Sequence, residues 1–267
     1  MTSSPQLDPA LQAHGLAAEL IATVDALVEH LRDLRVPQIP RGTPSLVAKI
    51  PFKVLVYRQV MTYRACDLAE AYVREANARA FIPCFLLSRA LFEGACALYD
   101  LALRIDALVA SDATKDVEAF DTHVMALMHG TKSSNWRALG ASLQSVNVLT
   151  LVDRVAKKVG TYVTEAYEDL SEFCHPNAAG AATSFAPPEL AERAAVFVAS
   201  PALSDSTGVA WHIRATNVAL YLHLQAAAMI QSSSPSLVSL CERAIHEAGT
   251  WPASVPYPSQ SSGQGGA

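Results

Sequence analysis

Arg89 and Glu93 form the first of two polar patterns whose residue types could support chemistry. They are four residues apart in an otherwise apolar segment. At about 100° per residue this spacing puts them on one side of a helix, where an arginine and a glutamate can form an ion pair. Asp100 and Arg104 fall on the same side farther along the chain. The segment therefore predicts a helix that carries a narrow charged strip.

The second pattern is Tyr167, Ser171 and His175, which follow one another at i, i+4 and i+8. On a helix these three positions span only about 80° of arc, so they share a face. Pro176 disfavours a helical conformation in the residue before it, which predicts that the helix ends at His175. The helix dipole favours a protonated imidazole at that end.

Two interpretations of these patterns remain open. In the first, the two strips face each other across a bundle and form a candidate catalytic site: Arg89 binds an anion, Glu93 orients Arg89, and His175 transfers a proton or binds a ligand. Tyr167 and Ser171 would then donate hydrogen bonds. In the second, which we favour, the ion pair is structural and His175 only caps its helix, because charged strips are mostly solvated and isolated histidines are mostly structural.

Other chemical sites have weaker support. Ser171 and His175 are close simply because they are helical neighbours, and no third acid is evident for a catalytic triad. A di-metal site needs two E-x-x-H helices and two further glutamates, whereas Glu172-Phe173-Cys174-His175 is the only such sequence here. His123 and His129 are six residues apart and so face opposite ways. We therefore expect no metal and no cofactor.

The elements that position these residues are predicted to be helices. Alanine is abundant and residues 84–175 contain no proline, a composition that favours helix. Capping residues, prolines and glycines predict an all-α antiparallel bundle of about seven helices, with a short additional helix near 136–144. The expected helices cover about residues 8–35, 52–79, 83–110, 114–130, 147–175, 206–230 and 234–248.

The remaining segments differ in character. Residues 177–204 contain Pro187-Pro188 between apolar runs, which predicts either a short β-hairpin or a loop with one helical turn. Residues 251–267 are rich in proline, serine, glutamine and glycine, and we expect a disordered tail. Residues 1–250 are predicted to form a single helical domain.

Composition limits the partners and the compartment. The net charge is −5, from 20 Lys and Arg against 25 Asp and Glu, so nucleic acid is not the favoured partner. The five cysteines are scattered without a C-x-x-C pair, and the start of the chain lacks the pattern of a signal peptide. The uncharged stretch between Arg214 and Glu242 is too polar for a membrane span, so we expect a buried helix. These features predict a cytoplasmic protein with no membrane segment.

The two patterns resemble those of a widespread uncharacterised bacterial all-helical family, a domain of unknown function. Its members pair an R-x-x-x-E helix with a later Y-x-x-L-S-x-x-x-H helix end. The matching stretches here are Ser88-Arg89-Ala90-Leu91-Phe92-Glu93-Gly94-Ala95 and Tyr167-Glu168-Asp169-Leu170-Ser171-Glu172-Phe173-Cys174-His175-Pro176. The resemblance spans residues 50–230 and implies a helical fold with Arg89, Glu93, Tyr167, Ser171 and His175 as its marked positions. It implies no activity.

The fold is also distantly similar to HEPN domains, helical bundles often found in toxins and antiphage systems, some of which cleave RNA as dimers. That similarity implies a link to stress or phage defence. The nucleases among them use an arginine followed four to six residues later by a histidine. None of the eight histidines here has an arginine at that distance, so we do not expect ribonuclease activity of that kind.

Nucleotide-binding glycine loops, the G-x-S-x-G elbow and the H-E-x-x-H zinc motif do not occur in this sequence. We therefore expect a cytoplasmic helical binding or assembly module that acts as a homodimer or with a protein partner. The alternative is an enzyme or ligand-binding protein that uses the five marked residues on a phosphorylated or nucleic-acid substrate.

Overall fold

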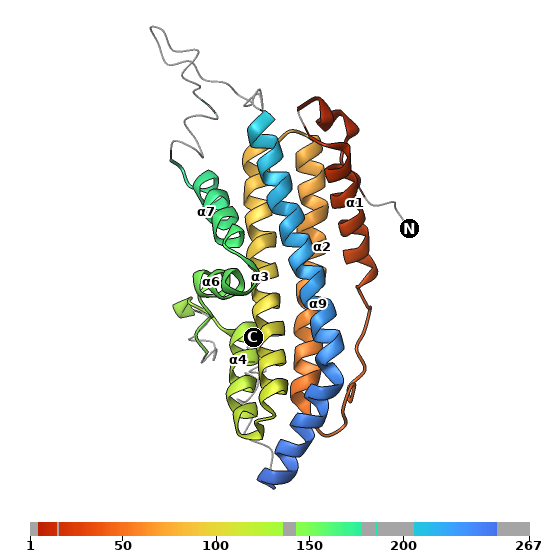
Figure 1. The fold of residues 1–267 in the computed structure, drawn as a ribbon, viewed down its shortest axis with the longest axis vertical. Helices are drawn as coiled ribbons and strands as arrows, with labels where there is room; N and C mark the ends of the chain where they lie inside the picture. The colour runs from red at the N-terminus through yellow and green to blue at the C-terminus, as the bar shows by residue number, and fades with distance from the viewer. Residues whose placement is uncertain (1–4, 15, 136–142, 178–184, 186–205, 250–267) are drawn as a thin grey trace, which may run out of the picture. The chain divides into compact units, whose positions relative to one another are not determined.

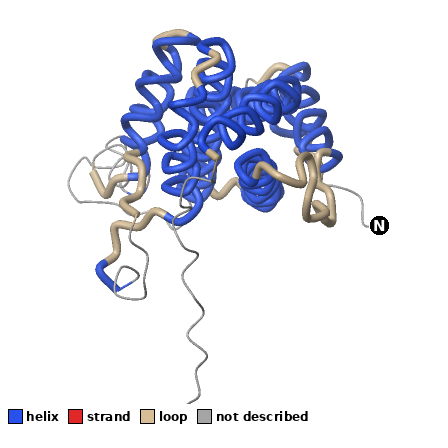
Figure 2. The backbone as a smooth tube through the Cα atoms, turned by 90° about the horizontal axis from the view of Figure 1, so that it is seen from below, coloured by secondary structure: helices blue, strands red, loops and turns tan. Residues whose placement is uncertain are grey.

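The computed structural model describes residues 5–14, 16–135, 143–177, 185 and 206–249, and these residues form helices joined by loops. No strand occurs in these ranges (Figure 2). The prediction of an all-α fold is therefore confirmed. The helices are η1 (Pro9–His14), α1 (Ala18–Asp33), α2 (Lys49–Asn77), α3 (Phe81–Ser111), η2 (Thr114–Asp116), α4 (Val117–His129), α6 (Val148–Val159), α7 (Tyr162–Cys174) and α9 (Ser206–Ala248) (Figure 1).

The chain divides into two compact units. The first comprises Met1–Gln38, Arg58–Ala102 and Val148–Met229, and the second comprises Ile39–Tyr57, Leu103–Asn147 and Ile230–Ala267. The helices α2, α3 and α9 each supply residues to both units. The expected single domain over residues 1–250 stays a prediction.

In the first unit, α9 packs on α2 through two buried histidines. The hydroxyl of Tyr72 lies 2.8 Å from Nδ1 of His212, and the hydroxyl of Thr62 lies 3.4 Å from Nε2 of His223. From the first contact to the second, the residue number falls from 72 to 62 on α2 and rises from 212 to 223 on α9. These two helices therefore run antiparallel. All four side chains are buried.

The helix α3 completes the core of this unit. The hydroxyls of Ser88 on α3 and Thr216 on α9 are 2.7 Å apart, and the Phe85 ring makes an edge contact with His212. These contacts put α3 parallel to α9 and antiparallel to α2. Large apolar side chains, among them Phe85, Phe92, Leu98, Leu170, Ile213 and Leu220, are fully buried in this unit.

The second unit is held partly by polar contacts. Lys53 donates to both carboxylate oxygens of Asp121, at 2.7 and 2.8 Å. Ser45 accepts hydrogen bonds from the backbone amides of Val47 and Ala48, just before α2, and donates one to Glu242, at 2.7 Å. Serine hydroxyls commonly bond backbone amides two or three residues later in this way, which satisfies donors in the turn before a helix.

Two predicted helix boundaries are wrong. The helix expected over residues 147–175 is divided at Gly160, whose φ of 141° is a conformation that residues with a Cβ rarely adopt, so α6 and α7 are separate helices. Conversely, α9 continues through Pro235, where a break was expected. Pro235 is exposed, and Ser233 on the preceding turn donates to Asp106 at 2.6 Å, a tertiary contact that helps hold the helix there.

The expected starts of two helices, at residues 8 and 114, are only partly correct. Asp8 accepts a hydrogen bond from the Ala10 amide, as a capping residue does, but the helix after it is a short 3₁₀ turn and α1 begins only at Ala18. Thr114 does not cap α4, because its hydroxyl donates to Glu247 instead. The predicted segments 136–144 and 177–204 and the tail 251–267 lie wholly or largely outside the described residues.

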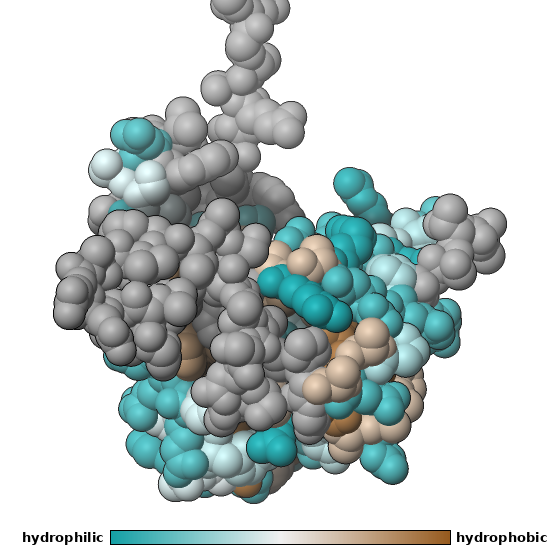
Figure 3. Space-filling view, turned by 90° about the horizontal axis from the view of Figure 1, so that it is seen from above, coloured by the Kyte–Doolittle hydropathy of each residue, from teal (hydrophilic) through white to brown (hydrophobic). Residues whose placement is uncertain are grey.

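One described helix segment, Ile82–Ser111, is long and apolar enough to cross a bilayer by length and composition, and 56% of its most apolar window is buried inside the protein. A buried core helix meets the same criteria, so this finding does not assign a membrane. On the face drawn in Figure 3, brown apolar patches lie among teal polar side chains of the described residues.

Candidate functional site

The candidate site forms where α7 packs on α3 in the first unit. Phe173 stacks on Phe85 with ring centroids 4.2 Å apart, and Tyr167 packs against Phe92 with centroids 6.3 Å apart. The two helices therefore run antiparallel. Val163, Tyr167 and Leu170 are buried, and their spacing is that of one face of a helix. This apolar face brings the Tyr167 hydroxyl to the charged strip of α3.

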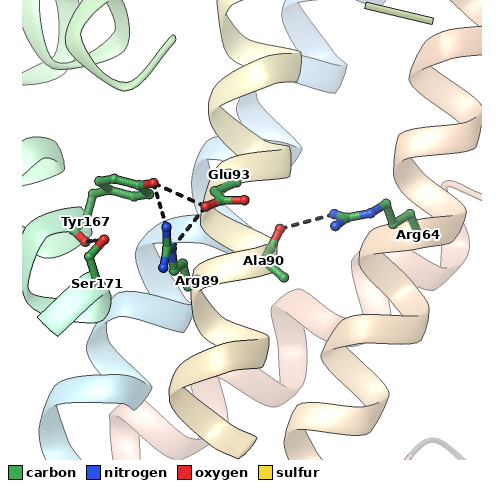
Figure 4. A network of polar contacts seen from close by, with 6 residues as sticks. All are labelled: Arg64, Arg89, Ala90, Glu93, Tyr167 and Ser171. Carbon is green, nitrogen blue, oxygen red and sulfur yellow. Dashed lines mark hydrogen bonds and ion pairs between the residues drawn. The ribbon is translucent and has the colours of Figure 1, made fainter. Parts of the chain in front are cut away.

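Arg89, Glu93 and Tyr167 form a closed triad of hydrogen bonds (Figure 4). Arg89 Nε donates to Glu93 Oε1 at 3.0 Å, and Arg89 Nη2 donates to the Tyr167 hydroxyl at 3.3 Å. The Tyr167 hydroxyl in turn donates to Glu93 Oε1 at 3.2 Å. The tyrosine is buried, whereas the side chains of Arg89 and Glu93 are 28% and 30% exposed. One positive and one negative charge are thus paired at the edge of the protein.

The triad stabilises the charge on Arg89. Burial lowers the pKa of Arg89, but the hydrogen bond to Tyr167 and the nearby Tyr167, Glu93 and Cys174 outweigh that effect and raise it. Because an arginine is protonated throughout the normal pH range, the consequence is a stronger contact rather than a titration. Glu93 already neutralises the guanidinium, and this weakens its attraction for an external anion.

The other two predicted site residues do not join the triad. Ser171 donates its hydroxyl to the backbone carbonyl of Tyr167, at 2.8 Å, within its own helix. His175 is exposed and has an extended backbone one residue beyond the end of α7, so the predicted helix end is correct. No hydrogen bond joins His175 to the triad among the described residues. The structure therefore brings together three of the five residues.

The charged strip on α3 is not exposed to solvent along its whole length. Asp100 is buried, and Arg154 of α6 donates to its carboxylate at 3.3 Å. A buried carboxylate requires such a partner because its desolvation is costly. The α6–α7 pair is thus attached to α3 at two polar points, the triad and the Asp100–Arg154 contact. Arg104 belongs to the second unit.

Two residues near the triad were missed by sequence reasoning. Cys174 interacts with Arg89: burial raises the pKa of its thiol, and the guanidinium only partly opposes this. Cys174 is seven residues after Tyr167, a spacing that places both on one helix face and could have identified it.

The second missed residue is Arg64 of α2, which donates to the Ala90 carbonyl of α3 at 3.1 Å (Figure 4). It passes close to Gly94, where an added Cβ would lie 3.2 Å from Arg64 Nη1 and from Met61 Cε. The only local signal for this crossing is the glycine itself.

The arrangement favours attachment of helices over proton transfer. Glu93 and Tyr167 are engaged with Arg89, and the histidine expected to act as acid or base is outside their hydrogen-bonded ring. In the part of the chain that the structure describes, no three His, Cys, Asp or Glu side chains lie close enough together to hold a metal ion. The five cysteines are free thiols.

Comparison of the chain with protein-family models, with curated proteins and with solved structures finds no match. The resemblance to the bacterial helical family and to HEPN domains therefore stays a prediction, as do the link to stress or phage defence and the cytoplasmic location.

Proposed function

We propose that this chain is a non-catalytic helical binding or assembly module that works through contact with another protein chain. The observation that supports this most directly is the closed Arg89–Glu93–Tyr167 triad. Its hydrogen bonds are made within the protein, and its charges cancel. Such a cluster fixes the position of α7 on α3 and so shapes a surface.

The enzymatic alternative requires a proton-transfer group in reach of the triad. His175 is the residue expected for that task, and its exposed position beyond α7 does not favour it. Binding of a phosphorylated ligand by Arg89 is also disfavoured, because Glu93 would have to be displaced or its charge opposed.

Light scattering coupled to size exclusion, together with a pull-down from a native lysate, tests the proposal. We expect a homo-oligomer or a retained protein partner. A strictly monomeric chain that retains no partner contradicts the proposal. Turnover of a substrate that is lost in Glu93→Gln and His175→Ala would contradict it in favour of the enzyme.

A further inference from the structure

The segment just ahead of η1 is bonded by side chains of two helices of the first unit. At the end of α2, the Asn77 side chain accepts from the Asp8 amide and donates to the Gln6 carbonyl, each at 2.7 Å. On α1, the Asp25 carboxylate accepts from the Leu7 amide at 3.0 Å. In an extended segment, one residue's amide points to one edge, and the preceding carbonyl and the following amide point to the other. Asn77 and Asp25 therefore bond opposite edges of this segment, as neighbouring strands do in a sheet.

These three hydrogen bonds involve only the peptide backbone of the segment. Two of its side chains, Leu7 and Leu11, are buried, with exposed fractions of 2% and 3%. Between the leucines, the Asp8 carboxylate accepts from the Ala10 amide and starts the turn of η1, which packs on α1 (Figure 1). Backbone hydrogen bonds combined with pockets for a few side chains are a recurring way to bind peptides. The arrangement fits a peptide with one leucine in an extended segment and a second leucine four residues later.

We call residues 5–14 the N-terminal strap, and it is held by few groups. Gln6 and Asp8–Ala10 are exposed, so burial is concentrated on Leu7 and Leu11. The conformational entropy lost on ordering about ten residues offsets most of the stabilisation from two buried leucines and three hydrogen bonds. The ends of a chain also open more readily than its core. The strap can therefore detach while the helices of the bundle remain packed.

Detachment of the strap leaves Asn77 and Asp25 without these backbone partners. Asp25 is half-buried, and burial raises the pKa of its carboxyl, an effect that the Leu7 amide partly opposes. A carboxylate in such a place is stabilised by an amide donor, and the Asn77 side chain offers both a donor and an acceptor. A second peptide with the same backbone geometry can satisfy all of these groups.

From this arrangement we infer that Asn77, Asp25 and the buried positions of Leu7 and Leu11 form a peptide-binding site for a different protein. The N-terminal strap is the internal competitor for this site. The inference rests on the proposed binding function and gives the chemistry of the partner, a leucine-containing segment in an extended conformation.

The choice of a different protein over a second copy follows from competition and charge. The strap of a second copy offers only the contacts that the chain's own strap already makes, and the chain's own strap acts at a much higher effective concentration. Two copies also carry a net charge of −5 each and repel one another. A different protein can add contacts outside the site, and these compensate for displacing the strap.

Binding of a labelled peptide to the full-length chain tests the site. The probe is a fluorescein-labelled peptide of residues 4–14, and Leu7→Asp together with Leu11→Asp gives a released variant of the chain. The closed strap lowers the apparent affinity of the wild type by the fraction of open chains, so fluorescence anisotropy should show binding about tenfold tighter to the released variant. A peptide that carries the same two substitutions should not bind. Equal affinity of the two chains, or no binding to a released variant that circular dichroism shows to be folded, overturns the inference.

Substitutions in the released variant test the two polar groups. Asn77→Leu and Asp25→Ala each remove hydrogen bonds to the peptide backbone, and we expect each to weaken binding about fivefold. Asp33→Ala is the matched control, because Asp33 is an exposed carboxylate on the same helix as Asp25. The control should bind the peptide as the released variant does. If Asn77→Leu and Asp25→Ala also leave binding unchanged, the assignment of the site is overturned.

Hydrogen exchange of the wild type tests whether the strap opens by itself. The amides of Leu7 and Asp8 should exchange about a hundredfold faster than those in the buried turns of α2 and α3. NMR spectroscopy at neutral pH resolves the individual amides. Exchange at the rate of the core would show that the strap opens only when the protein unfolds, which overturns its role as a competitor.

Three outcomes separate the inference from the proposed function. A released variant that binds the peptide, in a chain that stays monomeric and retains no partner, overturns the proposed function but not the site. A retained partner whose binding is changed neither by release of the strap nor by Asn77→Leu overturns the inference but not the proposed function. A wild-type dimer that is lost when the strap is released contradicts the choice of a different protein, because exchanged straps would then join two copies.

Discussion

The contact between α7 and α3 and the contact between α9 and α2 both join helices through hydrogen-bonded polar side chains, but they differ in exposure. The Arg89–Glu93–Tyr167 triad is at the edge of the protein, and two of its side chains are almost one-third exposed. The histidines His212 and His223 are each only 2% exposed. Solvent screens the charges of the triad and so weakens its contribution to stability. Burial makes the contacts of the two histidines sensitive to protonation of the imidazole rings.

The two regions also differ in whether water can hydrate a charged side chain. Arg89 and Glu93 remain partly hydrated when separated, so losing the contact leaves no uncompensated charge. A protonated His212 would be a buried cation beside neutral groups, since burial is the only identified cause of its lowered pKa. The buried histidine contacts, not the charged triad, should therefore determine how stability depends on pH.

The largest expected effect is loss of stability in acid. Burial lowers the pKa of His212 to about 3 and that of His223 to about 4, from 6.5. Because the folded pKa values lie below the unfolded ones, this contribution is fully present above pH 6.5 and is lost as the pH falls toward the folded values. Each histidine lowers the free energy of unfolding by about 1.4 kcal/mol per pH unit below 6.5, so by about pH 4.5 the pair lowers it by about 5–6 kcal/mol.

Urea unfolding followed by Trp211 fluorescence measures this loss in a Trp136→Phe, Trp251→Phe background. In the double variant His212→Asn, His223→Gln, the dependence on pH between 6.5 and 4.5 should be much flatter, whatever its absolute stability. An equal slope in the parent and the double variant would show that other groups govern the acid response.

The next largest effect is expected for Tyr72→Phe. It removes the hydroxyl 2.8 Å from His212 Nδ1 and leaves a buried ring nitrogen without that partner. We expect a loss of about 1–3 kcal/mol in the free energy of unfolding at pH 7. Thr62→Val, which removes the longer 3.4 Å contact to His223, should cost less. A larger loss for Thr62→Val than for Tyr72→Phe would show that the shorter hydrogen bond is not the more stabilising one.

Tyr167→Phe should have a smaller effect. The hydroxyl both accepts from Arg89 and donates to Glu93, but its partners are partly hydrated. We expect a loss of about 1 kcal/mol. A double-mutant cycle with Glu93→Gln, measured by the same unfolding assay, gives the coupling between the two side chains. If Tyr167→Phe lowered the free energy of unfolding as much as Tyr72→Phe does, exposure would not explain the difference in strength between the two contacts.

The smallest effect is expected for His175→Ala. The side chain is exposed and lies after the last turn of α7, so the free energy of unfolding should change by less than about 0.5 kcal/mol. Association should also be unchanged. A marked loss of stability would show that His175 contributes to the fold, and a marked loss of association would place it at an interface; either result contradicts this expectation.

The parts of the site that depend on nearby residues could be predicted from the sequence, and the distant contacts could not. Arg89 and Glu93 are four residues apart, so helical geometry alone predicts their ion pair. Pro176 likewise fixes the end of α7. By contrast, the contact of Tyr167 with this pair joins residues 78 and 74 positions away, and depends on where α7 begins and how it turns.

The errors in the predicted helices have a common cause. A single glycine costs a helix only about 1 kcal/mol, so Gly160 alone did not indicate a break between α6 and α7. A proline costs about 3 kcal/mol, yet α9 continues through Pro235 because tertiary contacts compensate. In both places packing outweighs local preference. The partner of His212 was equally hidden, since Tyr72 is 140 positions away.

Gly160 determines more than the length of two helices. If residues 148–174 formed one straight rod, Arg154 and Tyr167 would be about 20 Å apart along it, because each residue advances a helix by about 1.5 Å. Asp100 and Glu93, the groups they contact on α3, are separated by only about half that distance. The break between α6 and α7 at Gly160 removes this mismatch. A residue without a side chain thus allows the Asp100–Arg154 contact and the triad to form at the same time.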